Sequence, residues 1–358
     1  MDMLLLEDCC DILDSQRVPI TAADRTKGEY PYYGANGIQD YVADYIFDDE
    51  LVLLAEDGGN FGSKERPIAY RVSGKCWVNN HAHVLKPKAE IDVDYLCYSL
   101  MFYNTDGLVN GATRQKLTQA TMRKMLIPKR SLEEQKAIVS KLVLTQSIIN
   151  HRKQQLAKLD ELVKARFVEM FGDIEDRRTI AEICSIIKDG THQPPKFVEN
   201  GIPFLFVSNI VTNEITYNAE KFISEETYNE LYKRTPIEIG DIVLSTVGSY
   251  GHPAVVKSNK RFLFQRHIAY LKPISSVVNS VYLHSAILSN DVQRQIDERV
   301  KGIAQKTLNL SEIRKVIVPI PSLVAQEQFA AFVEHTDKSK FITEIISIMR
   351  RVRLYDQF

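Results

Sequence analysis

Long apolar runs are missing from this sequence, and so is the basic head of a signal peptide. No stretch of 18 residues is apolar throughout, and residues 1–10 carry acids where a signal peptide would carry lysine or arginine. We therefore expect a cytoplasmic protein that does not enter a membrane.

Cysteine is scarce, and it lacks the spacing of a functional cluster. The chain has five cysteines and no Cys-x-x-Cys pair: Cys9, Cys10, Cys76, Cys97 and Cys184. An odd number without such pairs indicates neither a disulfide framework nor a zinc site. We expect the adjacent Cys9 and Cys10 to lie at the edge of a buried strand or helix.

Familiar catalytic motifs are also missing. Neither the GxxxxGK[ST] phosphate loop nor GxGxxG occurs, and residues 193–196 (QPPK) depart from the Asn/Asp-Pro-Pro-aromatic motif of amino-methyltransferases. Residues 134–136 (EQK) match the end of a nuclease motif, but no Pro-Asp strand precedes them. His81 and His83 could chelate a metal, yet the sequence offers no clear third ligand. We therefore predict a binding protein with no catalytic residues, no metal and no cofactor.

Acidic residues are absent from long stretches of a chain whose net charge is only -1. Residues 242–290 and 111–131 contain no Asp or Glu, and residues 58–89 hold six Lys or Arg against the single Glu65. Such segregation is the electrostatic pattern of a phosphate-binding face, even in a neutral protein. A basic surface that is merely solvated is the alternative.

One segment of the sequence occurs twice, at an offset of 191 residues. Gly111 falls on Gly302, and Leu117 falls on Leu308. Further on, four residues match without a gap, since Pro128, Ser131, Leu132 and Gln135 fall on Pro319, Ser322, Leu323 and Gln326. Shorter similarities join residues 6–12 to 180–186, 59–62 to 248–251 and 81–87 to 267–273. The chain therefore reads as domain, helix, domain, helix.

A long helix is predicted after Ser131. Ser131 and Glu134 have the spacing of a capping box, and Gly172 is placed to end the helix in a left-handed turn. Between them an apolar residue recurs every seven positions, at Leu142, Ile149, Leu156, Val163 and Met170. About 40 residues at about 1.5 Å each make a rod of about 60 Å. A partner helix is the better expectation for such a rod, and a helix that lies on its own domain is the alternative.

The two globular units are predicted to be α+β. At 358 residues the chain is too long for one ordinary core. We expect globular units at residues 1–110 and 174–301 and helical regions at residues 111–173 and 302–358, with long helices from about residues 132 and 323. Turn residues at 30–37, buried strands at 50–55, 202–207 and 241–245 and a helix at 282–299 are the individual expectations.

Two matching tripeptides carry side chains that can read DNA bases. Residues 79–81 (NNH) and 265–267 (QRH) precede similar segments in the two copies. Amides and arginine can make two hydrogen bonds to adenine and guanine edges, so their different identities would let the two domains read different bases. Ordinary loop chemistry is the alternative.

These motifs resemble the DNA-specificity subunit of type I restriction-modification systems over nearly the whole chain. Residues 189–195 (DGTHQPP), 201–205 (GIPFL), 240–245 (GDIVLS) and 265–269 (QRHIA) are similar to one type of recognition domain, and residues 30–40 (YPYYGANGIQD) and 54–58 (LAEDG) to another. The Pro-x-x-Ser-Leu segments at Pro128 and Pro319 resemble the starts of the conserved helical regions. The tail at residues 341–358 departs from the family, because it does not repeat residues 159–172.

The resemblance implies a fold and a set of partners. Two target-recognition domains would alternate with two long helices that pair as an antiparallel coiled coil, giving a tandem repeat with an approximate two-fold axis. The chain would bind double-stranded DNA, two methyltransferase subunits that use S-adenosylmethionine, and restriction or translocase subunits. The specificity subunit of a related type IIB enzyme, a self-contained DNA-modifying enzyme and a coiled-coil adaptor without a DNA role are the alternatives.

Candidate residues follow from the basic segments, the matching tripeptides and the turn motifs. The DNA-binding candidates are Asn36, Asn60, Lys64, Asn79, Asn80, His81, Arg114, Lys116, Lys124, Thr191, His192, Asn209, Ser245, Ser249, Lys257, Lys260, Arg261, Gln265, Arg266 and His267. The helix-pairing candidates are Leu142, Ile149, Leu156, Val163, Met170, Phe341, Ile345, Ile348 and Val352.

Overall fold

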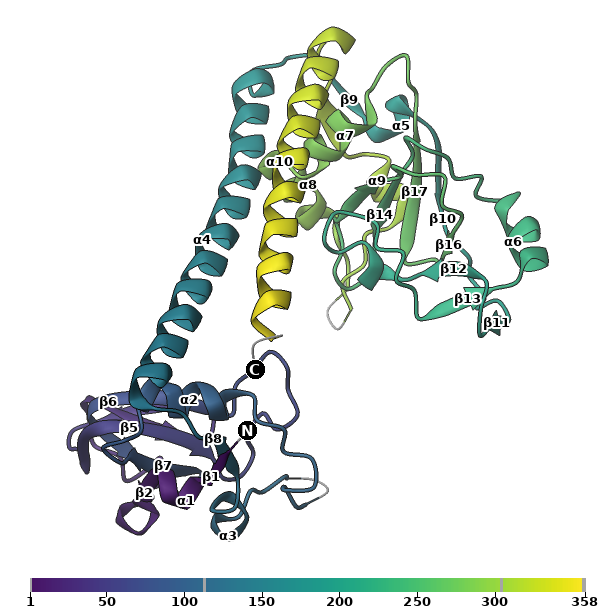
Figure 1. Cartoon of the computed structure of the whole chain (residues 1–358). Coiled ribbons are helices and arrows are strands. Elements are labelled where there is room, and N and C mark those ends of the chain that lie inside the picture. Colours follow the sequence, from purple (N-terminus) through teal and green to yellow (C-terminus); the bar gives the residue numbers. More distant parts are fainter. Residues whose placement is uncertain (1, 112–113, 303–304, 356–358) are drawn as a thin grey trace. The chain divides into compact units, whose positions relative to one another are not determined.

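The structure, a computed structural model, describes residues 2–111, 114–302 and 305–355, with side chains described up to residue 339. The chain, drawn in Figure 1, divides into two compact units, Met1–Ile149 and Asn150–Phe358. Each unit has its own hydrophobic cores. Within the described part of the chain, no helix combines the length and the apolar character that crossing a membrane requires.

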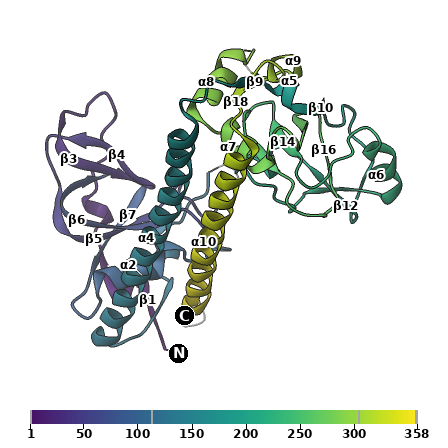
Figure 2. The same cartoon turned by 90° about the horizontal axis from the view of Figure 1, so that it is seen from above.

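A six-stranded sheet forms the centre of the first unit (Figure 2). Its strands lie in the order β2 (Cys10–Ile12), β7 (Ala82–Pro87), β5 (Phe47–Ala55), β6 (Ala69–Val78), β3 (Lys27–Gly34) and β4 (Gly37–Val42). Neighbouring strands are antiparallel except β3 and β6, which are parallel. Of the turn residues predicted at 30–37, only Ala35 and Asn36 lie in the turn, because residues 30–34 belong to β3 and β4 begins at Gly37. Gly37 has the predicted positive φ, at +108°, whereas Gly34 and Asn36 do not.

The strand predicted at residues 50–55 is confirmed as the second half of β5. Val52 and Leu54 pack in one core with helix α2 (Val93–Met101), while Leu51 and Leu53 pack in a second core on the other face of the strand. Because both faces are covered, this part of the strand is continuously apolar and does not alternate with polar residues.

A short two-stranded sheet closes each domain. In the first unit, β1 (Met3–Leu5) pairs antiparallel with β8 (Leu126–Pro128), next to α1 (Leu6–Cys9) and α3 (Gln119–Met122). In the second unit, β9 (Arg177–Thr179) pairs with β18 (Ile317–Pro319), next to α5 (Ile180–Ile183) and α9 (Leu310–Ile313). The strand that enters each domain thus pairs with the strand that leads into the following long helix. As expected, Cys9 and Cys10 are buried where α1 meets β2.

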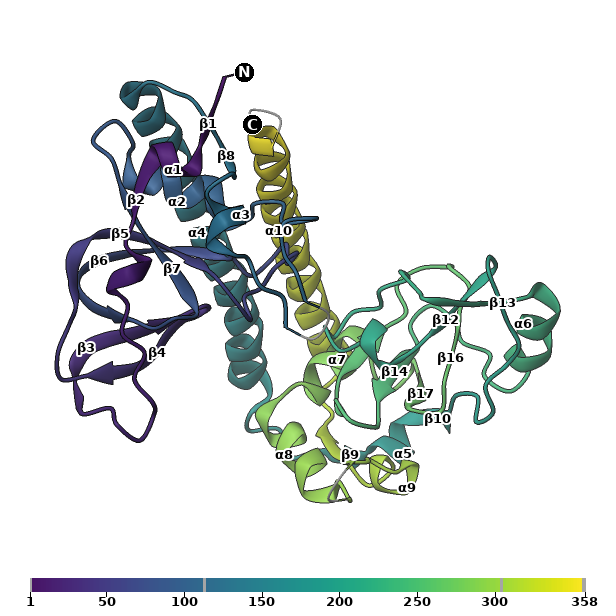
Figure 3. The same ribbon diagram turned by 90° about the horizontal axis from the view of Figure 1, so that it is seen from below.

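The second unit contains two four-stranded sheets. One has the order β10 (Cys184–Asp189), β17 (Ile268–Pro273), β14 (Ile242–Ser245) and β15 (Pro253–Val255). The other has the order β11 (Phe197–Val198), β13 (Lys221–Ile223), β12 (Ile202–Leu205) and β16 (Leu263–Phe264). Figure 3 shows this second sheet with α6 (Glu225–Tyr232) on the side of the unit away from α7 and α8. The strands predicted at 202–207 and 241–245 are confirmed as β12 and β14.

The single helix predicted at residues 282–299 is wrong, because the segment forms two helices. α7 (Ser280–Ile287) and α8 (Asn290–Arg299) are separated at Ser289. The Ser289 hydroxyl accepts a hydrogen bond from the Val292 amide at 3.4 Å, so it starts a new helix at this position.

The internal repeat is visible in the strand register. Leu85 of β7 pairs with Ile12 and Val52 in the first unit, and Leu271 of β17 pairs with Ile187 and Ile242 in the second. β2, β5, β7 and α2 therefore correspond to β10, β14, β17 and α7. β15 pairs antiparallel with β14 as β6 does with β5, so these two strands also correspond. In the first unit β3 and β4 continue the same sheet, whereas in the second unit β11, β12, β13 and β16 form a separate sheet.

The long helices are α4 (Leu132–Phe171) and α10 (Leu323–Tyr355). The predicted capping box is confirmed, since the Ser131 amide donates to Glu134 Oε2 at 2.8 Å and the Glu134 amide donates to Ser131 Oγ at 3.3 Å. The predicted left-handed turn at Gly172 is wrong. Its amide continues the helical pattern to the carbonyl oxygen of Val168 at 2.8 Å, and its φ is not positive.

The last turns of α4 pack against the first turns of α10 inside the second unit. The rings of Phe167 and Phe171 both contact the ring of Phe329, at centroid distances of 5.6 and 5.5 Å, and Val163 and Met170 join the same core. The two helices run in opposite directions along this contact (Figures 1 and 2). The predicted α+β fold with paired long helices is therefore confirmed, and the heptad pattern missed Phe167 and Phe171.

The other helix-pairing candidates lie in different parts of the molecule. In the first unit, Leu142 is half-buried and Ile149 is buried. In the second unit, Leu156 is half-buried. The side chains of the remaining four candidates, Phe341, Ile345, Ile348 and Val352, lie outside the described residues.

We expect Phe329→Ala to destabilise the second unit by about 3–5 kcal/mol, because it removes a fully buried ring from an aromatic cluster. Val168→Ala is the matched control on α4, since the Val168 side chain is 62% exposed. Urea unfolding followed by circular dichroism measures both variants. Equal midpoints for the two would show that Phe329 does not hold the helices together.

Candidate nucleic-acid interface

Three segments of the first domain meet at the end of its central strands. They are residues 56–60 after β5, residues 79–81 before β7, and the loop at residues 110–116, of which 112 and 113 lie outside the described residues. Backbone hydrogen bonds join them, from Glu56 N to the His81 carbonyl at 2.9 Å and from Gly58 N to the Gln115 carbonyl at 3.1 Å. We call these segments the first loop cluster.

The second domain repeats the arrangement. Residues 246–251 follow β14, residues 265–267 precede β17, and residues 301–307 form the third segment, with 303 and 304 outside the described residues. The bonds run from Thr246 N to the His267 carbonyl at 2.9 Å and from Gly248 N to the Lys306 carbonyl at 3.0 Å. We call these segments the second loop cluster. The tripeptides 79–81 and 265–267 therefore occupy equivalent places.

One glycine in each third segment has a defined structural role. Gly111 and Gly302 have φ of +104° and +105°. A Cβ on either would lie 2.4 Å from the carbonyl oxygen of Arg114 or Gln305. Only glycine fits at both positions, which explains this pair of identities in the repeat.

The first loop cluster holds several predicted residues together through acids that the sequence analysis missed. Asp57 Oδ1 lies 2.7 Å from Arg114 Nη2 and 2.6 Å from His81 Nδ1. The Asn36 amide donates to the Gly58 carbonyl at 3.0 Å. Asn80 is exposed beside them. This surface therefore carries both acidic and basic side chains.

The second loop cluster has a different character, because none of its three segments contains an acid. Arg266 is exposed, and its Nε lies 3.4 Å from His267 Nε2. Burial, and to a lesser extent the Arg266 charge, lowers the pKa of His267, so the ring is neutral at neutral pH. Thr191 lies beside these residues, since its carbonyl accepts from the Arg266 amide at 3.0 Å. Gln265 is half-buried and Ser249 is exposed.

Three predicted DNA-binding residues are buried and used inside the fold. Asn79 is 3% exposed and donates to Gln39 Oε1 at 3.0 Å. Asn209 is buried and donates to the Thr216 carbonyl at 3.1 Å. Ser245 is buried, and its hydroxyl accepts from the His252 amide at 2.9 Å. Because their polar groups are already paired away from the surface, we correct their expected place from the interface to the scaffold.

The remaining basic candidates lie away from the loop clusters. Lys257, Lys260 and Arg261 are exposed between β15 and β16, and each has a local partner. Lys257 Nζ is 3.3 Å from Asp337 of α10, Lys260 Nζ is 4.9 Å from the ring centroid of Tyr217, and Arg261 pairs with Glu225. The others are Lys64 after the first segment of the first loop cluster, Lys124 after α3, and His192, which pairs with Asp189 at 2.7 Å. Asn60 is not among them, because it is the last residue of that first segment.

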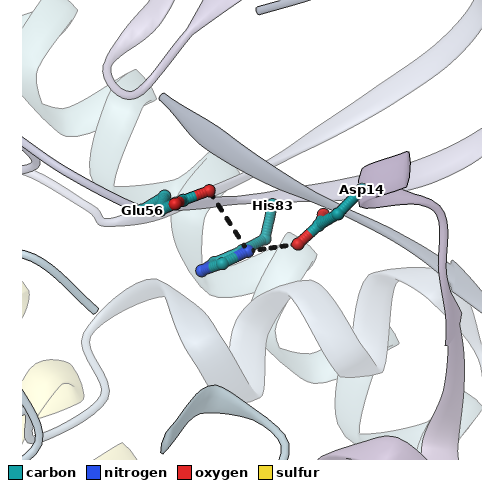
Figure 4. A group of neighbouring side chains, drawn as sticks. All are labelled: Asp14, Glu56 and His83. Carbon is teal, nitrogen blue, oxygen red and sulfur yellow. Dashed lines mark hydrogen bonds and ion pairs between the residues drawn. The ribbon is translucent and has the colours of Figure 1, made fainter. Parts of the chain in front are cut away.

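Figure 4 shows that Glu56, the first residue of the first loop cluster, lies close to His83 and Asp14. His83 is fully buried, with Nδ1 2.6 Å from Asp14 Oδ2 and 3.7 Å from Glu56 Oε2. Its Nε2 lies 2.9 Å from the Leu117 carbonyl oxygen. Both ring nitrogens thus face oxygen atoms that can accept hydrogen bonds. The sequence analysis named His83 but offered no further ligand, whereas the fold brings two carboxylates to it.

Hydrogen-bond donors already occupy these carboxylates. Arg17 Nη1 donates to Glu56 Oε2 at 2.7 Å, and Lys116 Nζ is 3.0 Å from Glu56 Oε1. Asp14 accepts from Gln119 Nε2 and from the Val84 amide, both at 2.9 Å. His83, Asp14 and Glu56 lie close enough to hold a cation, but Arg17 supplies the positive charge there. We call this group the charge brace.

Hydrogen bonding dominates the ionisation of the charge brace. Burial favours the protonated form of Asp14, but hydrogen bonds from His83 and Gln119 outweigh it and lower the pKa of the carboxyl. The pKa of Glu56 is lowered in the same way, since hydrogen bonds from Arg17 and Lys116 outweigh burial. The strand register places neutral Thr246 and Ala269 at the positions of Glu56 and His83, so the second domain lacks an equivalent of this pair.

Comparisons with known proteins agree on one family. The family described as the type I restriction modification DNA specificity domain matches residues 1–159 and 175–348. The chain is 27% identical to a type I restriction enzyme specificity subunit of Haemophilus influenzae over 365 residues, which cover 96% of this chain and 88% of the relative.

Two solved structures share the fold. The type I restriction-modification S subunit of M. genitalium aligns with a TM-score of 0.56 at 14% identity, covering 99% of this chain and 94% of that one. A structure from work on complex assembly and conformational transition of the type I system aligns with a TM-score of 0.58 at 14% identity, covering 99% and 95%.

The charge brace predicts an acid-sensitive first domain. Because the pKa of Asp14 is lower in the folded chain than its ordinary value, its stabilisation is present at neutral pH and is lost as the pH falls through the folded-state pKa. Asp14→Asn should lower stability at pH 7 by about 1–3 kcal/mol and flatten the acid side of the profile. Urea midpoints between pH 3 and pH 7 measure this, with Asp106→Asn, an exposed carboxyl, as the control. Parallel profiles for the wild type and Asp14→Asn would contradict it.

Proposed function

The chain belongs to the type I restriction-modification DNA specificity family, and from this premise we propose that it recognises a bipartite DNA target for such a system. The observation that carries the proposal is the pair of loop clusters. They occupy equivalent places in two domains, and they present different side chains. Equivalent sites with different chemistry suit two unlike half-sites.

The loop clusters supply the groups that read bases. In the first cluster, Asn80 and Arg114 offer amide and guanidinium donors, and an ion pair with Asp57 restrains Arg114. Asn36, whose side chain donates to the Gly58 carbonyl, adds a further amide next to the cluster. In the second cluster, Gln265 and Arg266 offer the same kinds of group without an acid. Paired hydrogen bonds from such side chains distinguish adenine and guanine in the major groove. We therefore assign base reading to these residues, with His81 and His267 beside them.

The other basic and small polar candidates, some within the loop clusters and some away from them, would contact the phosphate backbone. Such contacts fix the position of a protein on DNA without reading its sequence. We assign this role to Asn60, Lys64, Lys116, Lys124, Thr191, His192, Ser249, Lys257, Lys260 and Arg261. Their contribution should fall steeply as salt rises.

The proposal extends to domains and partners. Target-recognition domains at residues 1–110 and 174–301 would alternate with conserved helical regions at residues 111–173 and 302–358. Two methyltransferase subunits, which bring S-adenosylmethionine, and restriction or translocase subunits would assemble on this chain. Support comes from the family and from the specificity subunit of Haemophilus influenzae. Incubating the chain alone with DNA and labelled S-adenosylmethionine tests its role, because methyl transfer without a partner would indicate a self-contained enzyme.

Arg266→Ala should weaken binding of the cognate DNA by about 1–3 kcal/mol and relax selectivity at the base that Arg266 reads. Fluorescence anisotropy with DNA selected by the wild-type chain measures the loss, and methylome sequencing of cells with the partner genes reports the changed motif. Arg294→Ala on α8 is the matched control, since Arg294 is an exposed arginine of the same unit. An unchanged motif and affinity for Arg266→Ala would contradict the assignment.

The long helix should set the distance between the half-sites. Four residues inserted between Leu142 and Leu156 add about one turn, or about 6 Å, and nearly keep the seam in phase. With about 3.4 Å per base pair, the unread gap should lengthen by one or two base pairs while both half-sites stay the same. Selection from a random DNA library measures the gap. A new half-site with the old gap would show that α4 is not the ruler.

A further inference from the structure

A fully buried glutamine lies in the first turn of each long helix. Gln135 of α4 is 1% exposed and Gln326 of α10 is 0% exposed, although glutamine is usually a surface residue. The repeat aligns these two residues at its offset of 191. Their burial therefore needs a structural reason that holds in both copies.

Both glutamines make the same three hydrogen bonds. Gln135 Oε1 accepts from the Asp92 amide at 2.7 Å, and its Nε2 donates to the Glu90 and Arg130 carbonyls at 2.9 and 3.0 Å. Gln326 Oε1 accepts from the Asn279 amide at 2.8 Å, and its Nε2 donates to the Val277 and Pro321 carbonyls at 3.1 and 2.9 Å. The side-chain amide thus joins the entry of the long helix to another segment of the domain.

That other segment is the start of α2 in the first domain and of α7 in the second. Asp92 and Asn279 are the N-caps of α2 and α7, and each side chain accepts from two amides of the helix that follows. A tyrosine adds a fourth bond, since Tyr95 and Tyr282 hydroxyls donate to the Pro128 and Pro319 carbonyls at 2.8 and 2.7 Å. We call these four bonds the joint.

The joint connects the long helix to the loop cluster through rigid elements. In the first unit, Tyr95, Leu96 and Leu100 of α2 pack in one core with Val52 and Leu54 of β5. β5 leads into the first loop cluster, so the direction of the long helix is coupled to that surface. Hydrogen bonds restrict the angle between their groups more narrowly than apolar contact does.

The joint is conserved between copies that differ elsewhere. The first domain has one six-stranded sheet and the second has two four-stranded sheets, yet the same four bonds occur in both. A stabilising contact could have differed between the domains as the sheets do. A contact that sets the same angle in both domains is expected to keep the same bonds, as these four do.

We propose that Gln135 and Gln326 are positioning residues that fix the angle between each long helix and its recognition domain, and thereby the gap between the DNA half-sites. The proposal rests on the proposed function and adds a second determinant of the gap. Helix length sets how far apart the domains are, and the joint sets how each domain is turned on its helix.

Gln135→Met tests the proposal, because methionine has a similar shape and makes none of the three bonds. The site selected by the wild-type full chain from a random double-stranded DNA library is synthesised with its native gap and with gaps one base pair shorter and longer. Competition binding then gives the preference for the native gap. We expect Gln135→Met to reduce this preference at least threefold without changing either half-site, and Gln326→Met to act alike.

Three further variants separate positioning from stability. Gln154→Met on the exposed face of α4 is the matched control. Leu51→Ala removes a buried side chain from the core on the face of β5 opposite α2 and leaves all four bonds of the joint in place, so it should reduce binding to all gaps equally. Tyr95→Phe removes one bond of the joint while keeping the ring, and it takes the place of Gln135→Met if that chain does not fold.

The outcomes distinguish the two proposals. If the wild-type chain shows no selective DNA binding, the proposed function fails. If the wild type prefers its native gap and folded Gln135→Met, Gln326→Met and Tyr95→Phe keep the full preference, the positioning role alone is overturned. A changed half-site sequence with an unchanged gap preference would also overturn it.

Discussion

In each domain the buried side-chain amide of one glutamine joins the start of the long helix to the N-terminus of α2 or α7 by hydrogen bonds. Here the chain passes from β8 into α4, or from β18 into α10. The same place buries backbone groups at the N-terminus of α2 or α7. A buried amide or carbonyl without a partner costs free energy, and the glutamine satisfies both kinds at once. The closing sheets and the tyrosine bonds reinforce the same place.

Much of this fold was predictable because the repeat and the helical signals are local. The capping box at Ser131, the strands at 50–55 and 241–245 and the α+β class follow from nearby residues. The break at Ser289 and the end of α4 were not predictable in the same way. Ser289 is one of many serines that could cap a helix, and Gly172 ends α4 without the positive φ that glycine usually supplies there.

The candidate site was only half predictable. The tripeptides 79–81 and 265–267 were found because they precede similar strands. Asp14, Arg17 and Glu56 were not, because they are far from His83 in sequence and meet it only when β7 lies between β2 and β5. Asn79 and Ser245 were predicted to bind DNA because they are polar residues of the matching motifs, but their side chains make hydrogen bonds inside the domain.

The distribution of differences between the two copies separates two tasks. Where the copies agree, at the joint, the closing sheets and Gly111 and Gly302, the shared groups are buried bonds or backbone geometry. They differ in the strands beyond the shared part of the sheet, in the residues that line the loop clusters and in the charge brace. In the proposed function, different side chains in the two loop clusters change which bases are read and leave the shared groups in place. If the loop clusters read the half-sites and the joint sets the angle of each domain, as proposed, altering the loops of one domain would change its half-site and leave that angle unchanged, because Gln135 and Gln326 lie outside the loop clusters.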